Sequence, residues 1–352
     1  MPLYERVAGL PVEVESVELE RLEYRLSEEF TRATTVVHLR GAGEEGVGED
    51  VTYDAAAHDS VPLPPLERSW ESLDELSRSL EGVDLFAEPP KFGGVPEYRR
   101  WAVESAALDL ALRQAGLSLA EAVGREPRPV TFVASMGLGN PPTVTPVQRW
   151  LDLYPELRFK LDPSSAWDEA LAGELAALGC VDTLDLKGAY RNTPVDQGAD
   201  PRLYRLVAER FPAAWIEDPN LDDDAEAAAA LKPHRDRITW DAPIHSVADA
   251  EALPFPPKTL NVKPSRFGSV RRLFDFYDWC EARGIGLYGG GQWELGPGRG
   301  QIQLLAAIFH PDGPNDVAPG GYNRMPEPGL PVSPLGPAPA PRGFRREDGT
   351  HA

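Results

Sequence analysis

Residues 210–243 read RFPAAWIEDPNLDDDAEAAAALKPHRDRITWDAP. Two short apolar segments, AAWIE and RITWD, flank one helical run, and each segment ends in a carboxylate. An apolar strand, a helix and a second apolar strand in this order are typical of a parallel sheet that is covered by helices. The stretch therefore predicts a βαβ unit with an acidic residue at the end of each strand.

The same pattern extends in both directions along the chain. The other predicted strands are PVTFVASM (129–136), LRFKL (157–161), DTLDL (182–186), TLNVK (259–263) and GIGLYG (284–289). Seven such units, with a weak eighth strand near residues 316–318, predict a TIM-like (β/α)7β barrel over residues 128–323. An open doubly wound sheet is the alternative, but SMGLGNPP after the first strand runs into prolines instead of a GxGxxG turn.

The segments on either side of the barrel differ in composition. Residues 1–127 combine alternating apolar residues between Val12 and Tyr53 with amphipathic helices predicted at 69–82 and at 97–124, the latter ending at Gly124. This predicts an α+β capping domain. Residues 324–352 carry seven prolines and a charged end, so we expect an extended tail, draped over the barrel or partly disordered, that takes no part in chemistry.

The charge balance restricts the possible partners. The chain has 56 acidic and 35 basic residues and a net charge of −21, which would repel nucleic acids and anionic membranes. We see no secretory leader and no apolar stretch of the roughly 20 residues that span a bilayer. Cys180 and Cys280 lie far apart and are expected to be buried thiols. A cytoplasmic enzyme, possibly a homo-oligomer, is the expectation.

Five consecutive predicted strands end in ionisable residues: Lys160, Asp185, Glu217, Asp241 and Lys263. Chemistry in a TIM barrel gathers at these strand ends. Three converging carboxylates would repel one another unless a cation lay between them. Mg²⁺ prefers such oxygen ligands, and Mn²⁺ would also suit them. Singly, each aspartate could only be a helix N-cap, but the set predicts a metal site flanked by two lysines.

This order of lysine, aspartate, glutamate, aspartate and lysine resembles the enolase superfamily, and its muconate lactonizing enzyme and mandelate racemase-like subgroup in particular. The resemblance covers nearly the whole chain. It implies that Asp185, Glu217 and Asp241 bind Mg²⁺, while Lys160 and Lys263 face each other across a small-molecule carboxylate substrate. The implied chemistry is removal of the proton α to that carboxylate through an enediolate.

The resemblance leaves the outcome of the reaction open. A dehydratase, a racemase or epimerase, and a cycloisomerase all fit it, and we favour a syn-elimination like that of o-succinylbenzoate synthase. In that reaction Lys160 would be the base and Lys263 would act mainly as a cation beside the enediolate. The GGGQWELG loop with Trp293 and Glu294, and cap segments near Phe30 and Tyr53, would contact the substrate.

Two residues depart from the family pattern. Arg158 occupies the first position of the K-x-K motif, where we expect it to lie beside Lys160 and lower the pKa of that amine. Lys187 occupies the third position of Asp-x-Asn, where a salt bridge to a neighbouring carboxylate is the expected role.

These departures motivate one alternative function. It is a catalytically inactive barrel that binds metal and ligand without turnover. A metal-free barrel hydrolase with paired carboxylates is a further alternative.

Overall fold

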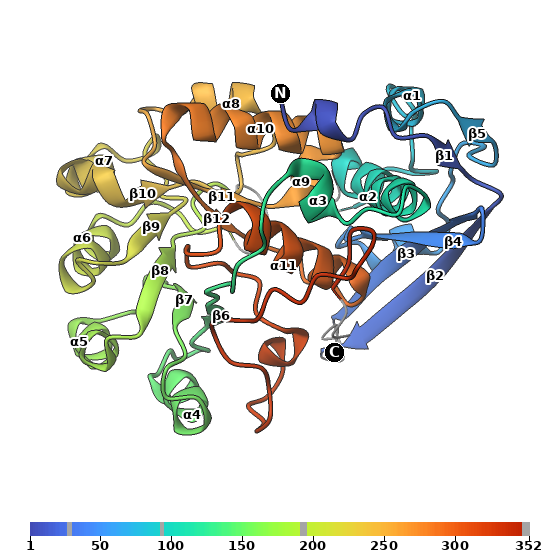
Figure 1. Ribbon diagram of the computed structural model, residues 1–352. Coiled ribbons are helices and arrows are strands. Elements are labelled where there is room, and N and C mark those ends of the chain that lie inside the picture. The colour runs from blue at the N-terminus through green and yellow to red at the C-terminus, as the bar shows by residue number, and fades with distance from the viewer. Residues whose placement is uncertain (27–29, 92–94, 191–195, 347–352) are drawn as a thin grey trace.

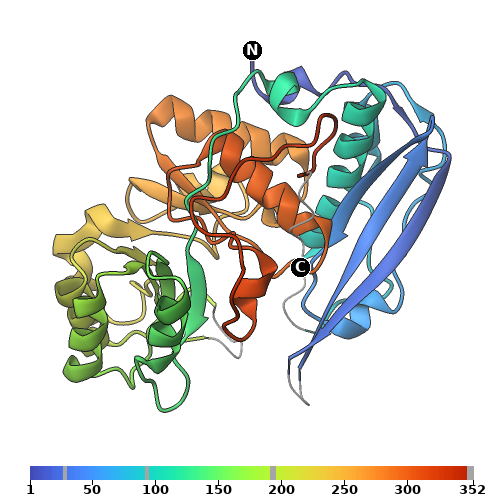
Figure 2. The ribbon, with the colours of Figure 1, turned by 60° about the horizontal axis from the view of Figure 1, so that its bottom comes forward.

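The computed structural model describes residues 1–26, 30–91, 95–190 and 196–346. A barrel of parallel strands and helices lies beside a smaller part that contains a twisted antiparallel sheet, as Figures 1 and 2 show. The predicted combination of a barrel and an N-terminal α+β capping domain is confirmed.

The cap is built around one antiparallel sheet and one long helix. Strands β2 (Ser16–Arg25), β3 (Thr31–Gly41) and β4 (Glu44–Asp50) form the sheet in that order. Helix α2 (Pro96–Gln114) packs so closely on β4 that Gly46 and Gly48 have no room for a side chain. A Cβ added at Gly46 would lie 2.2 Å from the Ala106 carbonyl oxygen, and one at Gly48 would lie 2.0 Å from that of Ala102. Smaller elements complete the cap: β1 (Val12–Glu13), β5 (Ser69–Trp70), α1 (Leu73–Ser79), η1 (Tyr4–Arg6) and η2 (Ala55–His58).

The helix predicted over residues 97–124 is divided in two. Helix α2 ends at Gln114, and the chain turns at Gly116, where φ is +70°. A second helix, α3 (Leu119–Val123), starts with a capping box between Ser118 and Glu121. The S-x-x-E sequence from Ser118 to Glu121 therefore marks the start of a second helix and not the interior of one long helix.

In the described part of the chain, seven parallel strands form the barrel: β6 (Ala134–Gly137), β7 (Phe159–Asp162), β8 (Val181–Asp185), β9 (Trp215–Glu217), β10 (Ile238–Thr239), β11 (Thr259–Val262) and β12 (Gly286–Gly289). Strands β6 to β10 pair in chain order, and β11 pairs with β12. The Asn261 amide donates to the Trp240 carbonyl at 3.0 Å and joins the two sheets. Bridges from Asp316 to Gly290 and from Asn315 to Phe132 supply the eighth position, which closes the barrel as predicted.

Helices follow the strands around the outside of the barrel (Figure 2). They are α4 (Thr145–Leu153), α5 (Glu169–Leu178), α6 (Pro201–Arg210), α7 (Ala225–Leu231), α8 (Val247–Glu251), α9 (Pro264–Phe267), α10 (Val270–Arg283) and α11 (Pro297–Phe309), with 3-10 turns η3 (Lys232–Arg237) and η4 (Gly320–Asn323). Helix α5 shows how the sequence sets such bounds: Asp168 caps its first turn, and Gly179 ends it in the left-handed conformation.

Two buried cap residues hold the loop between β12 and α11. Glu49 accepts hydrogen bonds from the backbone amides of Leu295 at 2.7 Å and Gly298 at 2.9 Å, where a helix N-terminus favours a carboxylate. Arg32 donates to the carbonyls of Gln292 at 2.8 Å and Trp293 at 3.1 Å. The cap therefore fixes the position of this loop at the barrel mouth.

The described part of the C-terminal tail packs against the rest of the protein. Leu335 pairs with Val130, and Phe344 is fully buried. Asp109 of α2 accepts a hydrogen bond from the Phe344 amide at 2.7 Å and pairs with the Arg345 guanidinium at 2.5 Å. The tail therefore contacts both Val130, before the first barrel strand, and helix α2 of the cap.

Truncating Phe344 should destabilise the protein without affecting the barrel mouth. The ring is completely buried and lies edge-on to Trp101, with 6.4 Å between centroids. We expect Phe344→Ala to lower the free energy of unfolding by about 3 kcal/mol in chemical denaturation. Val332→Ala is the matched control, since Val332 is 61% exposed. Equal stability of the two variants would contradict this role of the tail.

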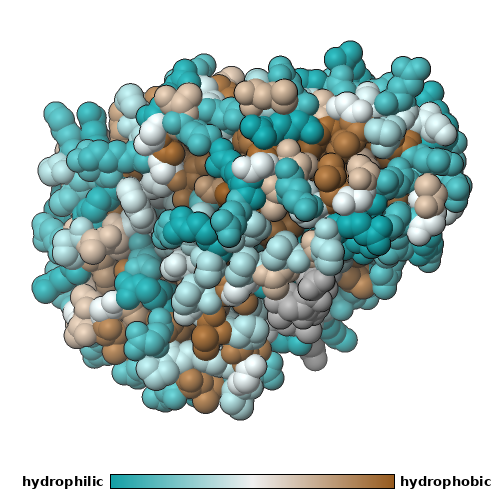
Figure 3. Space-filling view, viewed as in Figure 1, coloured by the Kyte–Doolittle hydropathy of each residue, from teal (hydrophilic) through white to brown (hydrophobic). Residues whose placement is uncertain are grey.

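Hydrophilic residues are spread across the face of the molecule that Figure 3 shows.

Within the described ranges, none of the helices has both the length and the apolar character needed to cross a bilayer.

Candidate metal centre and active site

All five residues predicted at strand ends are buried together at one end of the barrel. Lys160, Asp185 and Glu217 lie on β7, β8 and β9. Asp241 is the second residue after β10, and Lys263 directly follows β11. The three carboxylates are completely buried, and Lys160 and Lys263 are only 1% and 7% exposed. Each of these residues forms an ion pair with another member of the set.

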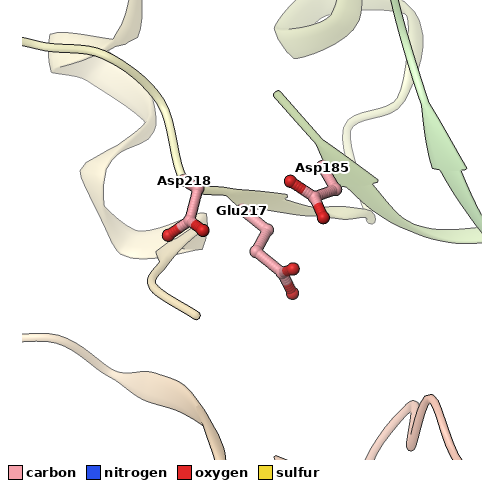
Figure 4. A group of neighbouring side chains, drawn as sticks. All are labelled: Asp185, Glu217 and Asp218. Atoms are coloured by element: carbon pink, nitrogen blue, oxygen red, sulfur yellow. The ribbon is translucent and has the colours of Figure 1, made fainter. Parts of the chain in front are cut away.

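Three carboxylates offer oxygen atoms within 4.8 Å of one another: Asp185, Glu217 and Asp218 (Figure 4). The strand-end pattern did not identify Asp218, which follows Glu217 and has a φ of +48°. Its two oxygens accept hydrogen bonds from the amides of Asp241 at 2.9 Å and Ala242 at 2.8 Å. Asp218 therefore anchors the backbone that carries Asp241.

The Asp241 carboxylate is surrounded by donors. It lies 2.9 Å from the Lys263 amine, 2.6 Å from the Arg266 guanidinium and 3.0 Å from the Tyr190 hydroxyl. Burial opposes ionisation, but the charges of Arg266 and Lys263 outweigh it and hold the pKa of Asp241 below its ordinary value. Asp241 also acts on its neighbours, because its charge contributes to the raised pKa values of Glu217 and Asp218.

Lys160 and Glu217 form a contact at the centre of the site. The Lys160 amine contacts the Glu217 carboxylate directly and lies 3.2 Å from Asp185 and 3.8 Å from Asp316. Burial disfavours the ammonium, but Glu217 and Asp185 outweigh it and hold the pKa of Lys160 well above its ordinary value. Burial raises the pKa of Glu217 to about 8 against the opposing charge of Lys160.

Two further donors fix Glu217. The Tyr288 hydroxyl from β12 donates to its carboxylate, and the Asn261 side-chain amide from β11 does so at 3.3 Å. Sequence reasoning missed both residues, although Asn261 lies in the quoted segment LNVK and Tyr288 in GLYG. Their strand positions could have suggested that they face the mouth, but not that they meet Glu217.

Lys187 forms the expected salt bridge. Its amine contacts Asp185 and lies 3.3 Å from Asp162, the last residue of β7. The Lys187 amide also donates to Asp185 at 3.1 Å. Burial acts to raise the pKa of Asp185, but Lys187 and Lys160 outweigh it and hold that pKa below its ordinary value.

Arg158 does not lie where the sequence suggested. Its guanidinium binds Asp182 through Nε at 2.7 Å and donates to the Gly179 carbonyl at 3.1 Å. The side chain is 41% exposed, whereas Lys160 is buried. The pairing of β7 with β8 shifts register between Phe159 and Lys160. The alternation of side chains along a regular strand therefore does not predict on which side Arg158 lies. Arg158 thus has other partners than Lys160, and the expectation that it lowers the pKa of Lys160 is wrong.

The substrate-loop candidates lie where cap and barrel meet. Trp293 stacks on Phe30 with 6.1 Å between ring centroids, and the Tyr53 hydroxyl donates to the Gln292 side chain at 3.2 Å. Glu294 is buried, accepts from the Gln292 amide at 2.6 Å and pairs with Arg299 at 3.2 Å. Phe30, Tyr53 and Trp293 therefore pack around this loop, whereas Glu294 holds the loop together.

The charges of the site fit a divalent cation. The connected cluster contains six carboxylates and four cationic side chains: Asp162, Asp185, Glu217, Asp218, Asp241 and Asp316, with Lys160, Lys187, Lys263 and Arg266. Among these described residues, two negative charges are formally uncompensated. Buried carboxylate oxygens with an excess of negative charge are ligands that a hard divalent ion prefers.

Family models match most of the chain. Residues 126–324 match the C-terminal domain, and residues 5–122 the N-terminal domain, of a family described as a domain of unknown function, DUF8230. An o-succinylbenzoate synthase from Geobacillus kaustophilus is 24% identical over 341 residues, which cover 88% of this chain and 85% of the relative.

Solved structures show the same fold. An unknown member of the enolase superfamily from Enterococcus faecalis V583 matches with a TM-score of 0.68 at 19% identity, over 97% of this chain and 95% of that chain. Muconate cycloisomerase from Pseudomonas fluorescens matches with a TM-score of 0.64 at 20% identity, over 97% of this chain and 96% of that chain. The chain therefore has the fold of these two proteins, which is the fold that the resemblance to the enolase superfamily implied.

Proposed function

The chain belongs to the DUF8230 family and has the fold of the enolase superfamily, and on this basis we propose that it is a magnesium-dependent enzyme that removes the proton α to a substrate carboxylate. One observation carries the proposal. Two lysines and three carboxylates from five successive strands meet, buried, at the end of the barrel where TIM-barrel chemistry takes place.

Asp185, Glu217 and Asp241 are the proposed ligands, with Mg²⁺ as the cation and Mn²⁺ as a possible substitute. Asp241 is preferred to Asp218 because both Asp218 oxygens are taken by backbone amides, whereas the partners of Asp241 are side chains that can rearrange. When bound, the cation would stabilise the negative charge that develops on the substrate carboxylate as the α-proton leaves.

Lys160 is the proposed base. It is the more deeply buried of the two lysines and touches two of the proposed ligands, so its amine lies close to any carboxylate that binds beside them. To accept a proton, Lys160 must present a neutral amine and therefore has to leave its ion pairs. Lys263 shares Asp241 with Arg266 and would stabilise the enediolate as a cation from that side of the site.

The substrate is proposed to be a small carboxylic acid that binds between the barrel mouth and the cap. Phe30, Tyr53 and Trp293 would contact the part of the substrate that is not held by the barrel. The favoured outcome is a syn-elimination, and the name of the o-succinylbenzoate synthase relative agrees with it.

The alternatives are weaker on the same observations. An inactive metal-binding barrel gives no reason for two buried lysines at the same group of carboxylates. A metal-free hydrolase with paired carboxylates leaves both lysines without a task and the carboxylates with excess charge.

A panel of acids tests the outcome of the reaction. The purified protein is incubated with Mg²⁺ and either β-hydroxy carboxylates or chiral N-acyl amino acids, with EDTA as the control. We expect loss of water from a β-hydroxy acid, detected by mass spectrometry. Racemisation without any dehydration would contradict the proposed elimination but agree with proton abstraction. No turnover of either class of acid would contradict the proposal that the protein is an enzyme of this kind.

A further inference from the structure

One residue, Lys187, takes both oxygens of Asp185. Its backbone amide donates to Asp185 Oδ1 at 3.1 Å, and its ammonium contacts Oδ2. The short reach back is possible because Lys187 has a φ of +54°, in the left-handed region that lysine rarely adopts. A proposed metal ligand is therefore fully engaged by the residue two positions further along the chain.

The backbone around Lys187 is fixed by its neighbours. The amides of Leu186 and Gly188 donate to the carbonyls of Glu217 and Asp218, both at 2.9 Å. A Cβ at Gly188 would meet the Asn220 amide nitrogen at 2.4 Å, so this turn packs directly on the chain after β9. Lys187 can change partners by rotating its side chain, but not by moving its backbone.

Asp162 offers the Lys187 ammonium a second position. Asp162 Oδ1 lies 3.3 Å from the Lys187 amine and is buried without a hydrogen-bonded partner. It ends β7, next to the strand that carries Asp185, so a small side-chain rotation transfers the ammonium from one carboxylate to the other. The Lys187 ammonium is already an ion-pair partner of this oxygen, and moving fully onto it would add the hydrogen bond that the buried oxygen lacks.

We propose that Lys187 is an internal counter-ion that competes with the divalent cation for Asp185, and that Asp162 accepts its ammonium when the cation binds. This inference rests on the proposed function, because it assumes that Asp185 is a metal ligand. The physical reason is that an ammonium and a divalent ion on one carboxylate repel each other in a buried site. Lys187 and Asp162 are thus positioning residues that set the metal affinity.

Calorimetric titration with Mg²⁺ tests the competition. Lys187→Gln keeps a polar, slightly shorter side chain but removes its charge, and we expect it to bind Mg²⁺ roughly tenfold more tightly than the parent. Lys258→Gln is the matched control, because it removes the same charge from an exposed pair with Asp236 at 2.6 Å. Lys187→Arg keeps the charge and should bind Mg²⁺ no more tightly than the parent.

The double variant tests the role of Asp162. Asp162→Asn should weaken Mg²⁺ binding severalfold in the parent but have little effect in the Lys187→Gln background. A similar loss in both backgrounds would mean that Asp162 acts only through its own charge and would overturn its role as acceptor. Parent-like or weaker binding by folded Lys187→Gln would overturn the competition. A parent that binds no Mg²⁺ would instead remove the proposed metal site itself.

Discussion

Replacing Lys160 with alanine should abolish exchange of the substrate α-proton, whereas Lys263→Ala should still exchange it slowly. Lys160 is buried against Glu217 and Asp185, two of the proposed metal ligands, and we propose that the substrate carboxylate binds beside them. Lys263 lies beside Asp241 and Arg266 and is expected to stabilise charge without taking the proton. Loss of a catalytic base should lower the rate by at least about a hundredfold.

The measurement is proton NMR of the α-position in deuterium oxide with each folded variant. Lys258→Ala, which removes an exposed lysine, is the control. Exchange that survives in Lys160→Ala and disappears in Lys263→Ala would reverse the assignment. Exchange that survives in both would place the base elsewhere, and Lys187 would be the next residue to replace.

Removing any one proposed ligand should largely abolish metal binding. Asp185→Asn, Glu217→Gln and Asp241→Asn each delete a buried negative charge from a cluster in which two negative charges are formally uncompensated. Replacing a residue that only supports a metal ligand commonly lowers metal affinity about 10- to 100-fold, so we expect losses of roughly a hundredfold or more for a ligand itself in Mg²⁺ calorimetry.

Two further variants make this result specific. Asp182→Asn is the control, because Asp182 lies on β8 with Asp185 but forms its ion pair with Arg158 and not with a residue of the site. Asp218→Asn should have a smaller effect than Asp241→Asn, since Asp218 holds the Asp241 backbone. The reverse order would make Asp218 the third ligand, and parent-like binding by all three ligand variants would refute the metal centre.

The barrel and the five strand-end residues could be predicted because both follow from local sequence. Short apolar strands recur at intervals of one βα unit, and five of them end in a charge that a buried strand would not carry without a reason, as in AAWIE and TLNVK. The partners of these residues could not be predicted in the same way. Tyr288 and Glu217 are 71 positions apart, and only barrel closure brings them together.

Local rules also failed where packing overrode them. Alternation along a strand placed Arg158 beside Lys160, but the shift in register between Phe159 and Lys160 goes with a partnership to Asp182. Glu294 is predicted from the sequence to contact the substrate, yet its side chain is buried in a loop that Glu49 and Arg32 hold from the cap. Such contacts depend on how two separate parts of the chain dock.

The most direct test of the central claim is α-proton exchange by the unmodified protein with and without Mg²⁺. A panel of carboxylic acids in deuterium oxide is followed by proton NMR, first with Mg²⁺, then with excess EDTA, and finally with Mg²⁺ restored. The account predicts that at least one acid loses its α-proton signal only when Mg²⁺ is present. Exchange that continues unchanged in EDTA, or no exchange of any acid by a protein that binds Mg²⁺, would contradict it.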